Sequence, residues 1–215
     1  CSQCLLFSAR LYIDMGIRLL EPNHWETQYP LSLTLFEMSA TVSCISGDIS
    51  TMSTCLQAVL SHVMAFEDSL KASSMLVKLL ASNSKYDDAR TNCLDILSKL
   101  GEEFPSEVSP PLVQQVLPAM LAVLRNITYD RIKALPAMTD EKKLNAMKFL
   151  NMLCMYCAVS KPLLLPFLTH RMMQLTLEHG FCEDSIVGIA TAGFSVVSMI
   201  MSQFWRFMSF SVRFT

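Results

Sequence analysis

The 215-residue sequence is poor in glycine, with 6 residues, and only 17% of its residues are charged. So few glycines argue against a turn-rich β protein. The net charge of −2 comes without long runs of one sign, and nucleic-acid binding requires a clustered basic surface. We therefore expect no nucleic-acid partner. Leucine and methionine together are twice as frequent as valine and isoleucine, which favours helix over sheet because unbranched side chains keep their rotamers in a helix.

Catalytic motifs are also missing. The sequence contains no GxxxxGK[ST], GxGxxG or HExxH pattern and no HRD and DFG set, so it lacks the local signatures of NTPases, zinc peptidases and kinases. The four histidines, His24, His62, His170 and His179, are not paired at metal-ligand spacing. We expect no enzyme activity from these residues, no catalytic residue, no cofactor and no bound metal.

Eight cysteines are present, too few for a disulfide scaffold in a chain of this length. Most lie in apolar helical stretches, where reduced cysteine behaves as a small hydrophobic residue; this favours a reducing, cytoplasmic location. The pair Cys154 and Cys157 has CxxC spacing, but a redox pair normally lies at a helix N-terminus. This pair instead continues an apolar stripe inside a helix, which favours core packing. Cys1 and Cys4 could supply two more zinc ligands, although nothing brings them near Cys154.

The first helical stretch presents one face of regularly spaced apolar residues, Leu11, Tyr12, Met15 and Leu19. Asn23 with Glu26 fits a capping box for the next helix, which Pro30 would kink or delay. Trp25 and Tyr29 lie four residues apart on one side of that helix. They are expected to be packing anchors between helices, with contact to a partner as the alternative.

Three further helix ends can be placed from cap residues. Ser109 precedes Pro110 and is the expected N-cap of a helix. Thr139 is the expected N-cap of a helix over 140–158, because acidic residues follow in its first turn. Gly180 is expected to end the helix that precedes it. Four basic side chains near these helices are expected to face solvent: Lys142, Lys143, His170 and Arg171.

The sequence repeats itself over two turn-plus-helix segments. Residues 47–59 align with residues 84–96, an offset of 37 (84 minus 47), close to the period of tetratricopeptide repeats (TPRs). The alignment pairs Gly47 with Ser84, Ile49 with Tyr86, Met52 with Ala89, Leu56 with Cys93 and Val59 with Ile96. We therefore predict an all-α, TPR-like superhelical stack of antiparallel helix pairs, in which neighbouring pairs share a core.

This array is expected to cover residues 1–182, with turns near 47, 84, 101–109, 126–139 and 159–161. Residues 183–215 are expected to form an apolar C-terminal helix and a divergent or truncated tail. An alternative exists for that end, because residues 185–205 carry no charge over a length that can span a membrane. The stretch contains six polar side chains, which favours the cytoplasmic array over a membrane-associated module anchored through 185–205.

Four segments occur in a familiar order: LLEPNHWETQYPLSLTLFEMSA (19–40), GEEFP (101–105), LPAMTDEKKLNAMKFL (135–150) and MMQLTLEHGFCEDSIVGIATAGF (172–194). Together they resemble the TPR-like helical region that follows the predicted AAA-type ATPase domain in large signalling proteins with serine/threonine kinase-like and GAF/histidine kinase modules. The resemblance fades after about Phe194. It implies a non-catalytic scaffold that binds a protein segment or the neighbouring ATPase domain and relays or regulates activity through protein–protein contacts.

Overall fold

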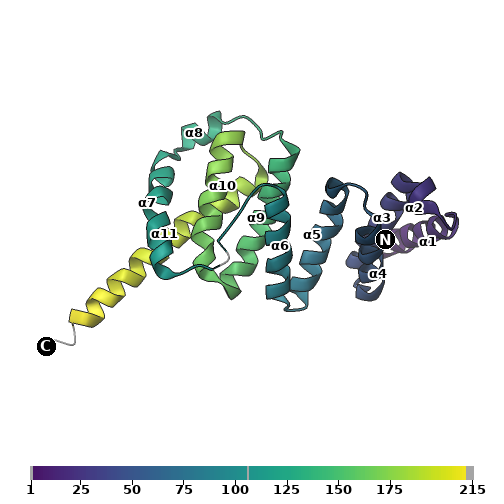
Figure 1. Ribbon diagram of the computed structural model, residues 1–215, viewed down its shortest axis with the longest axis horizontal. Coiled ribbons are helices and arrows are strands. Elements are labelled where there is room, and N and C mark those ends of the chain that lie inside the picture. Colours follow the sequence, from purple (N-terminus) through teal and green to yellow (C-terminus); the bar gives the residue numbers. More distant parts are fainter. Residues whose placement is uncertain (1, 106, 212–215) are drawn as a thin grey trace. The chain divides into compact units, whose positions relative to one another are not determined.

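The computed structural model of the protein describes residues 2–105 and 107–211, and the side chains of residues 5–105 and 107–197. Over those residues it consists of eleven α-helices and one short 3-10 helix without a β-strand (Figure 1). The all-α prediction is confirmed. The helices form two units, Cys1–Asn83 (unit 1) and Ser84–Thr215 (unit 2).

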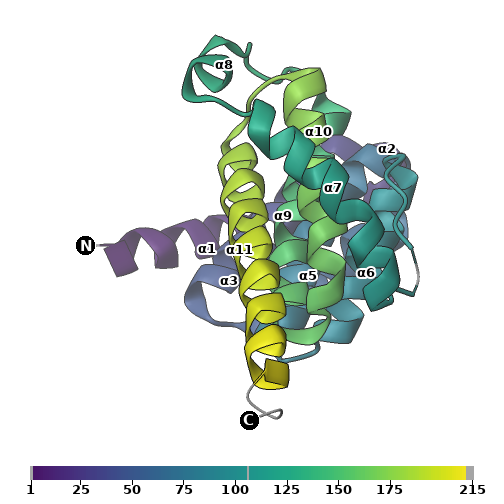
Figure 2. The same cartoon turned by 90° about the vertical axis from the view of Figure 1, so that its left-hand side faces the viewer.

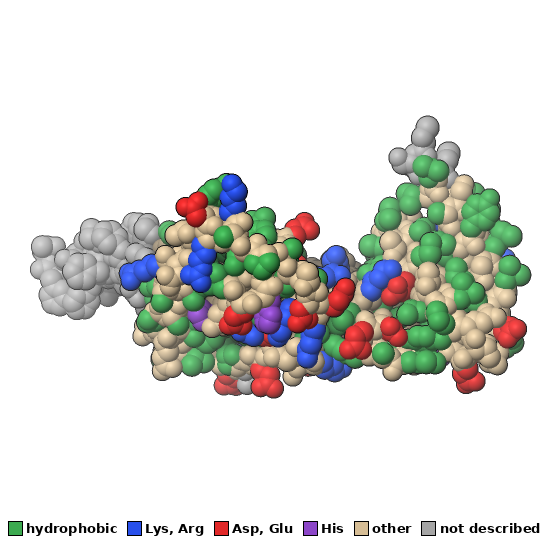
Figure 3. Space-filling model, turned by 90° about the horizontal axis from the view of Figure 1, so that it is seen from above, with side chains coloured by type: hydrophobic (Ala, Val, Ile, Leu, Met, Phe, Trp, Pro, Cys, Tyr) green, Lys and Arg blue, Asp and Glu red, His purple; other side chains and the backbone are tan. Residues whose placement is uncertain are grey.

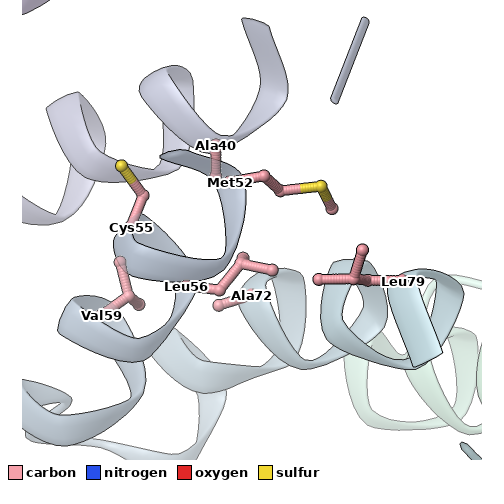
Figure 4. Packing of buried hydrophobic residues seen from close by; sticks show 7 residues of the cluster. All are labelled: Ala40, Met52, Cys55, Leu56, Val59, Ala72 and Leu79. Carbon is pink, nitrogen blue, oxygen red and sulfur yellow. The ribbon is translucent and has the colours of Figure 1, made fainter. Parts of the chain in front are cut away.

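Unit 1 contains five helices: α1 (Ser2–Arg18), α2 (His24–Thr27), α3 (Tyr29–Ser46), α4 (Ile49–His62) and α5 (Phe66–Ser82). Helix α3 packs against α1 and α4, and α4 packs against α5. Their shared core is shown in Figure 4 and consists of Ala40, Met52, Cys55, Leu56, Val59, Ala72 and Leu79. The two alanines face α4 from either side, and their small side chains let α3 and α5 approach it closely.

The start of α3 differs in part from the sequence prediction. Asn23 precedes α2, but its side chain makes no capping hydrogen bond, so the predicted capping box with Glu26 is wrong. The cause is its backbone: ψ of 27° is far from the extended conformation that points an N-cap side chain at the helix. Pro30 lies in the first turn of α3, where a proline costs no hydrogen bond, so the predicted delay of this helix is confirmed.

Helix α1 packs with a different face from the one predicted. Leu11, Tyr12, Met15 and Leu19 are between 50% and 82% exposed, whereas Ile13 is buried. Gly16 explains the choice of face, because a Cβ there would lie only 3.2 Å from the Leu35 side chain of α3. The missing side chain lets α3 approach this side of α1 and leaves the larger apolar face uncovered within unit 1.

The internal repeat is visible in the backbone. Gly47 and Ser84, which align in sequence, both have a left-handed backbone, with φ of 74° and 60°. Of the pairs that follow, Ile49 is exposed and Tyr86 half-buried, whereas the last three are buried in both copies: Met52 and Ala89, Leu56 and Cys93, Val59 and Ile96. Helices α4 and α6 therefore begin at equivalent positions and bury equivalent residues, although the Asp48 side chain caps α4 and the Lys85 side chain makes no such bond at α6. A superhelical arrangement of the helix pairs stays a prediction.

Unit 2 contains six α-helices and a 3-10 helix: α6 (Tyr86–Lys99), α7 (Pro110–Asn126), α8 (Tyr129–Ala134), α9 (Glu141–Ser160), η1 (Pro162–Leu164), α10 (Leu165–His179) and α11 (Glu183–Ser211). Helix α9 contacts α6, α10 and α11, which explains why side chains all around it are buried. Figure 2 shows α7, α10 and α11 side by side.

The boundary predicted after residue 182 is not where the chain divides. Helix α11 packs against α7, α9 and α10, and Gly188 lies so close to Met172 that a Cβ would be 2.8 Å from the methionine Cβ. Residues 183–197 therefore belong to unit 2, and the division lies between Asn83 and Ser84. Within the described residues no helix combines the length and hydropathy that a membrane span requires. The side chains of residues 198–205 lie outside the described part of the predicted span.

Two loops that are distant in sequence meet at the end of α10. Phe181 donates its backbone N–H to Pro136 (2.8 Å) and accepts from the N–H of Met138 (2.9 Å). Gly180, the predicted helix end, follows the last residue of α10 with φ of 105°. A Cβ at this position would lie 2.5 Å from the Pro136 carbonyl oxygen. Only glycine fits this joint, because both the backbone conformation and the space exclude a side chain.

The N-cap predicted for α7 is confirmed and the one predicted for α9 is wrong. Ser109 is the N-cap of α7 and Pro110 begins the helix, although the Ser109 hydroxyl makes no capping bond. At α9 the N-cap is Asp140, not Thr139: its carboxylate accepts from the backbone N–H groups of Lys142 (2.9 Å) and Lys143 (3.2 Å). Asp140 has the extended backbone of an N-cap and is followed directly by the helix, which leaves Thr139 one residue outside.

This cap can be tested with two neighbouring substitutions. We expect Asp140→Ala to lower the free energy of unfolding by about 1 kcal/mol, because two helix N–H groups lose their acceptor. Thr139→Ala is the matched control and should change it by no more than about 0.5 kcal/mol, as for an ordinary surface residue. Urea unfolding followed by circular dichroism measures both, and an equal loss in the two variants would contradict the assignment.

Candidate functional site

Trp25, one of the two predicted anchors, lies in an aromatic cluster of unit 1. Its indole ring stacks on the His62 ring of α4, with 4.8 Å between the ring centroids and 3° between the planes. Phe36 of α3 contacts the indole at 5.2 Å. The tryptophan is half-buried, and these contacts fix α2 to α3 and α4.

Tyr29, the second anchor, is held by hydrogen bonds. Its hydroxyl donates to Asp68 Oδ2 (2.7 Å) and accepts from the backbone N–H of Met64 (3.1 Å). Burial and the nearby Asp68 carboxylate raise the tyrosine pKa against the effect of the Met64 N–H, so the hydroxyl stays protonated and ties α3 to the start of α5. Packing accounts for both anchors, and contact with a partner stays a prediction.

The CxxC cysteines lie in the core of unit 2. Cys154 and Cys157 on α9 and Cys93 on α6 are all buried. Burial raises the pKa of Cys93 and Cys154 to about 12 and that of Cys157 to about 11. Such thiols are poor nucleophiles, because the reactive form is the thiolate. In the part of the chain that the structure describes, no group of His, Cys, Asp or Glu could hold a metal ion; Cys1 and the side chain of Cys4 lie outside it.

A buried carboxylate connects three segments of unit 2. Glu102, whose side chain is 3% exposed, accepts from Lys143 Nζ at Oε1 (2.8 Å) and from Arg171 Nε at Oε2 (2.6 Å). Lys143 and Arg171 were expected to face solvent, and this expectation is wrong. Sequence periodicity could not find the cluster, because Glu102 comes from a loop and lies 41 and 69 residues from its partners.

The same contacts decide the ionisation of Glu102. Burial alone would raise the pKa of its carboxyl group, but hydrogen bonds from Arg171 and Lys143 and their positive charges outweigh burial and lower the pKa. The neighbouring His170 has a buried Nδ1 without a hydrogen-bond partner among the described residues. Burial and the Arg171 charge lower the pKa of this imidazole, so it is stabilised in its neutral form.

A pocket of about 500 Å³ opens in unit 2 between α6, the loop after it, the end of α9 and η1. We name it the η1 pocket. Its apolar walls are formed by six residues: Leu94, Pro105, Val108, Pro162, Leu163 and Leu164. Arg90 and Lys161 bring positive charge to it, and Glu107 one negative charge. Its volume and its few charged groups among apolar walls are typical of a binding site.

The charges of the η1 pocket are held in different ways. Arg90 is fixed by an ion pair from Nη1 to Asp87 Oδ1 (2.7 Å) and its side chain is only 18% exposed. Lys161 is exposed where α9 ends. Among the described residues that line the pocket, Ser160 is the one with a hydroxyl group, and it donates to the backbone carbonyl oxygen of Tyr156 (2.9 Å) rather than to a base that would activate it. The pocket can therefore bind an apolar group that carries a negative charge. Sequence reasoning missed it because its walls come from residues 90 to 164.

Glu102 makes unit 2 sensitive to acid. We expect Glu102→Gln to lower the free energy of unfolding by about 2 kcal/mol at neutral pH, less than the 3–5 kcal/mol of a fully buried pair, because both cations keep contact with water. The lowered pKa stabilises the fold above the usual value of 4.5, and this contribution is lost as the pH falls through the folded pKa. Urea unfolding at several pH values should show the difference between the variants vanishing in acid. Glu103→Gln, at an exposed neighbour, is the control.

The buried cysteines should be unreactive in the folded chain. At pH 8 thiols of pKa near 11 or 12 are almost entirely protonated, so alkylation should be at least about 1,000-fold slower than in urea for Cys93 and Cys154 and at least about 100-fold slower for Cys157. Cys44, which is exposed, is the internal control. Mass spectrometry of labelled peptides gives each rate. Labelling of Cys154 or Cys157 as fast as that of Cys44 would reopen the case for redox chemistry.

No family model, curated protein or solved structure matches this chain. The resemblance to the helical region of signalling ATPases therefore stays a prediction, and function has to be inferred from the geometry of the described residues.

Proposed function

We propose that this chain is a non-catalytic helical interaction module that binds a protein segment in the η1 pocket. The observation that carries this proposal is the pocket itself, about 500 Å³ in volume and walled by leucine, proline and valine side chains. A volume of this size accepts one or two side chains of an extended segment rather than a whole helix.

The charges indicate what kind of segment fits. Arg90 and Lys161 outnumber Glu107 around the pocket, and the Arg90 head group is fixed in place by Asp87. A segment with an aliphatic side chain next to an aspartate or glutamate would satisfy both the apolar walls and the positive charge. Complementary charge of this kind steers association and excludes basic segments.

The resemblance suggests where such a segment comes from. In large signalling ATPases and kinases, a helical region next to the ATPase domain would bind a segment of that domain or of another protein and relay its state to later modules. The helical fold of unit 2 suits this role, because the pocket is formed by three separate elements. Binding to one of them changes the stability of the others.

Peptide selection tests the proposal without knowledge of the natural partner. A phage-displayed library of random peptides is selected on the folded chain, and single peptides are then measured by fluorescence polarisation. We expect enriched peptides to combine aliphatic and acidic residues and to bind with a dissociation constant of about 1–100 μM, as expected for a short segment. Leu163→Asp with Lys161→Glu should weaken binding at least about tenfold, because the pocket then repels an acidic segment.

The control is Ile186→Asp, which repeats the aliphatic-to-aspartate substitution of Leu163 at an exposed apolar position of α11 in the same unit. It should leave binding unchanged. If enriched peptides bind the pocket variant as tightly as the unaltered chain, or if they lack acidic residues, the η1 pocket is not their site and the proposal is wrong.

A further inference from the structure

Arg90 lies at the boundary between the η1 pocket and Asp87. On α6 it follows Asp87 by three residues and precedes Leu94 by four, so the three side chains lie along one face of the helix. Arg90 and Leu94 line the pocket, whereas Asp87 lies outside the lining residues. The ion pair from Arg90 Nη1 to Asp87 Oδ1 (2.7 Å) therefore holds the guanidinium from outside the pocket.

The rest of this guanidinium is available to a ligand. An arginine has five N–H donors, and among the described residues the bond to Asp87 uses one of those on Arg90. In the same part of the chain, the buried side-chain nitrogen without a hydrogen-bond partner is His170 Nδ1, so the unbonded nitrogens of Arg90 are in contact with water. One edge of a guanidinium presents two parallel N–H groups, which match the two oxygens of a carboxylate.

Packing restricts the direction in which this edge can point. The Arg90 side chain is mostly buried, and α6 packs against α9. Burial raises the pKa of the Cys157 thiol on α9, and the Arg90 charge partly opposes this rise, so the guanidinium lies close to the contact between the two helices. Lys161, by contrast, is exposed where α9 ends, and its flexible side chain is not held in one position. Arg90 is therefore the cation of the pocket with a fixed geometry.

Net charge alone does not specify what the pocket binds. The whole chain has a net charge of −2, and Figure 3 shows positive (blue) and negative (red) side chains interspersed on the face that it draws. At the pocket, the cations Arg90 and Lys161 are accompanied by Glu107 in the lining and by Asp87 beside it. Direct contact with Arg90, rather than net charge, therefore distinguishes a carboxylate from a neutral group.

We propose that Arg90 binds the carboxylate of an aspartate or glutamate in the partner segment through two N–H groups, and that Asp87 is the positioning residue that holds Arg90 for this contact. This inference rests on the function proposed above for the η1 pocket and names the residues that recognise the acid. Arg90 and Leu94 are separated by one helical turn, about 6 Å between their Cβ atoms. The carboxylate and the aliphatic group of the ligand should lie about as far apart.

Titrations followed by NMR test the contact with hexanoate, which joins a carboxylate to an aliphatic chain of sufficient length, and with hexanamide, its uncharged counterpart. We expect hexanoate to bind the whole chain with a dissociation constant of about 1–10 mM, as for a small ligand with few contacts, and at least about fivefold more tightly than hexanamide. Arg90→Lys should weaken hexanoate binding at least about fivefold, because a lysine cannot form the paired bonds, and should leave hexanamide binding unchanged.

Two neighbouring aspartates separate positioning from charge. Asp87→Ala should weaken hexanoate binding at least about threefold although it removes a negative charge, because Arg90 loses the group that holds it. Asp88→Ala is the matched control: it removes the same charge from an exposed neighbour in the first turn of α6 and should leave binding unchanged or strengthen it. Asp87→Glu should restore most of the affinity. An ion pair with an exposed partner adds little to stability, so these variants should stay folded, which circular dichroism checks.

Three results would overturn the roles of Arg90 and Asp87: equal affinity for hexanoate and hexanamide, hexanoate binding that Arg90→Lys leaves unchanged, or a gain in affinity for Asp87→Ala as large as that for Asp88→Ala. Competition with the selected acidic peptides separates this inference from the proposed function. If hexanoate binding depends on Arg90 but no peptide displaces hexanoate, the binding of a protein segment in the pocket is wrong. If peptides displace it and bind Arg90→Lys as tightly as the unaltered chain, the pocket binds a segment and the role given to Arg90 is wrong.

Discussion

The buried carboxylate of Glu102 is the interaction on which the architecture of unit 2 depends. Removing this group from water is costly unless cations and hydrogen bonds replace the lost hydration, so Lys143 of α9 and Arg171 of α10 must both reach it. The residue before it, Gly101, has φ of 85° and turns the chain so that Glu102 points inward. The loop after α6 is thereby fixed to α9 and α10, and this same loop supplies Pro105 and Val108 to the η1 pocket. The ion cluster therefore restrains the loop that forms one wall of the pocket.

Three of the four sequence segments that resemble a signalling family, those in unit 2, meet at such structural joints. GEEFP supplies Glu102, LPAMTDEKK supplies Lys143 and the backbone of Pro136 and Met138, and the segment 172–194 supplies Gly180 and Phe181. Phe181 pairs with the backbone on both sides of Ala137, and Gly180 leaves no room for a side chain. Polar residues and glycine in these segments have structural roles: Glu102 and Lys143 form an ion pair, Asp140 caps α9, and Gly180 allows the backbone to approach closely. These residues determine how the helices of unit 2 are joined.

Structural features that depend on residues close together in the chain are the ones that the sequence predicts best. Helix ends follow from glycine, proline and acidic residues close by, and the aligned positions Met52 and Ala89, Leu56 and Cys93 are buried because both segments repeat the same periodicity. Predictions of side-chain exposure fail where the exposure depends on residues far away in the chain. Whether Arg171 faces water depends on Glu102, and which side of α1 is covered depends on Gly16 and Leu35. Thr139 and Asp140 both have a suitable oxygen, and only the backbone of the folded chain selects Asp140. The η1 pocket has no local signal, because its walls are far apart in sequence.

Most side chains that could perform chemistry are already used for packing. Tyr29 is bonded to Asp68 and Met64, Trp25 stacks on His62, and the thiols of the CxxC pair are protonated in the core. Two apolar surfaces remain accessible among the described residues, the η1 pocket and the uncovered face of α1. The η1 pocket is concave, small and bordered by cations, so it suits a side chain or two of an extended acidic segment. The face of α1 that unit 1 leaves uncovered is convex and carries the exposed side chains of Leu5, Phe7, Leu11, Tyr12 and Met15. The two surfaces differ in shape and in the charges beside them, so they favour partners of different kinds.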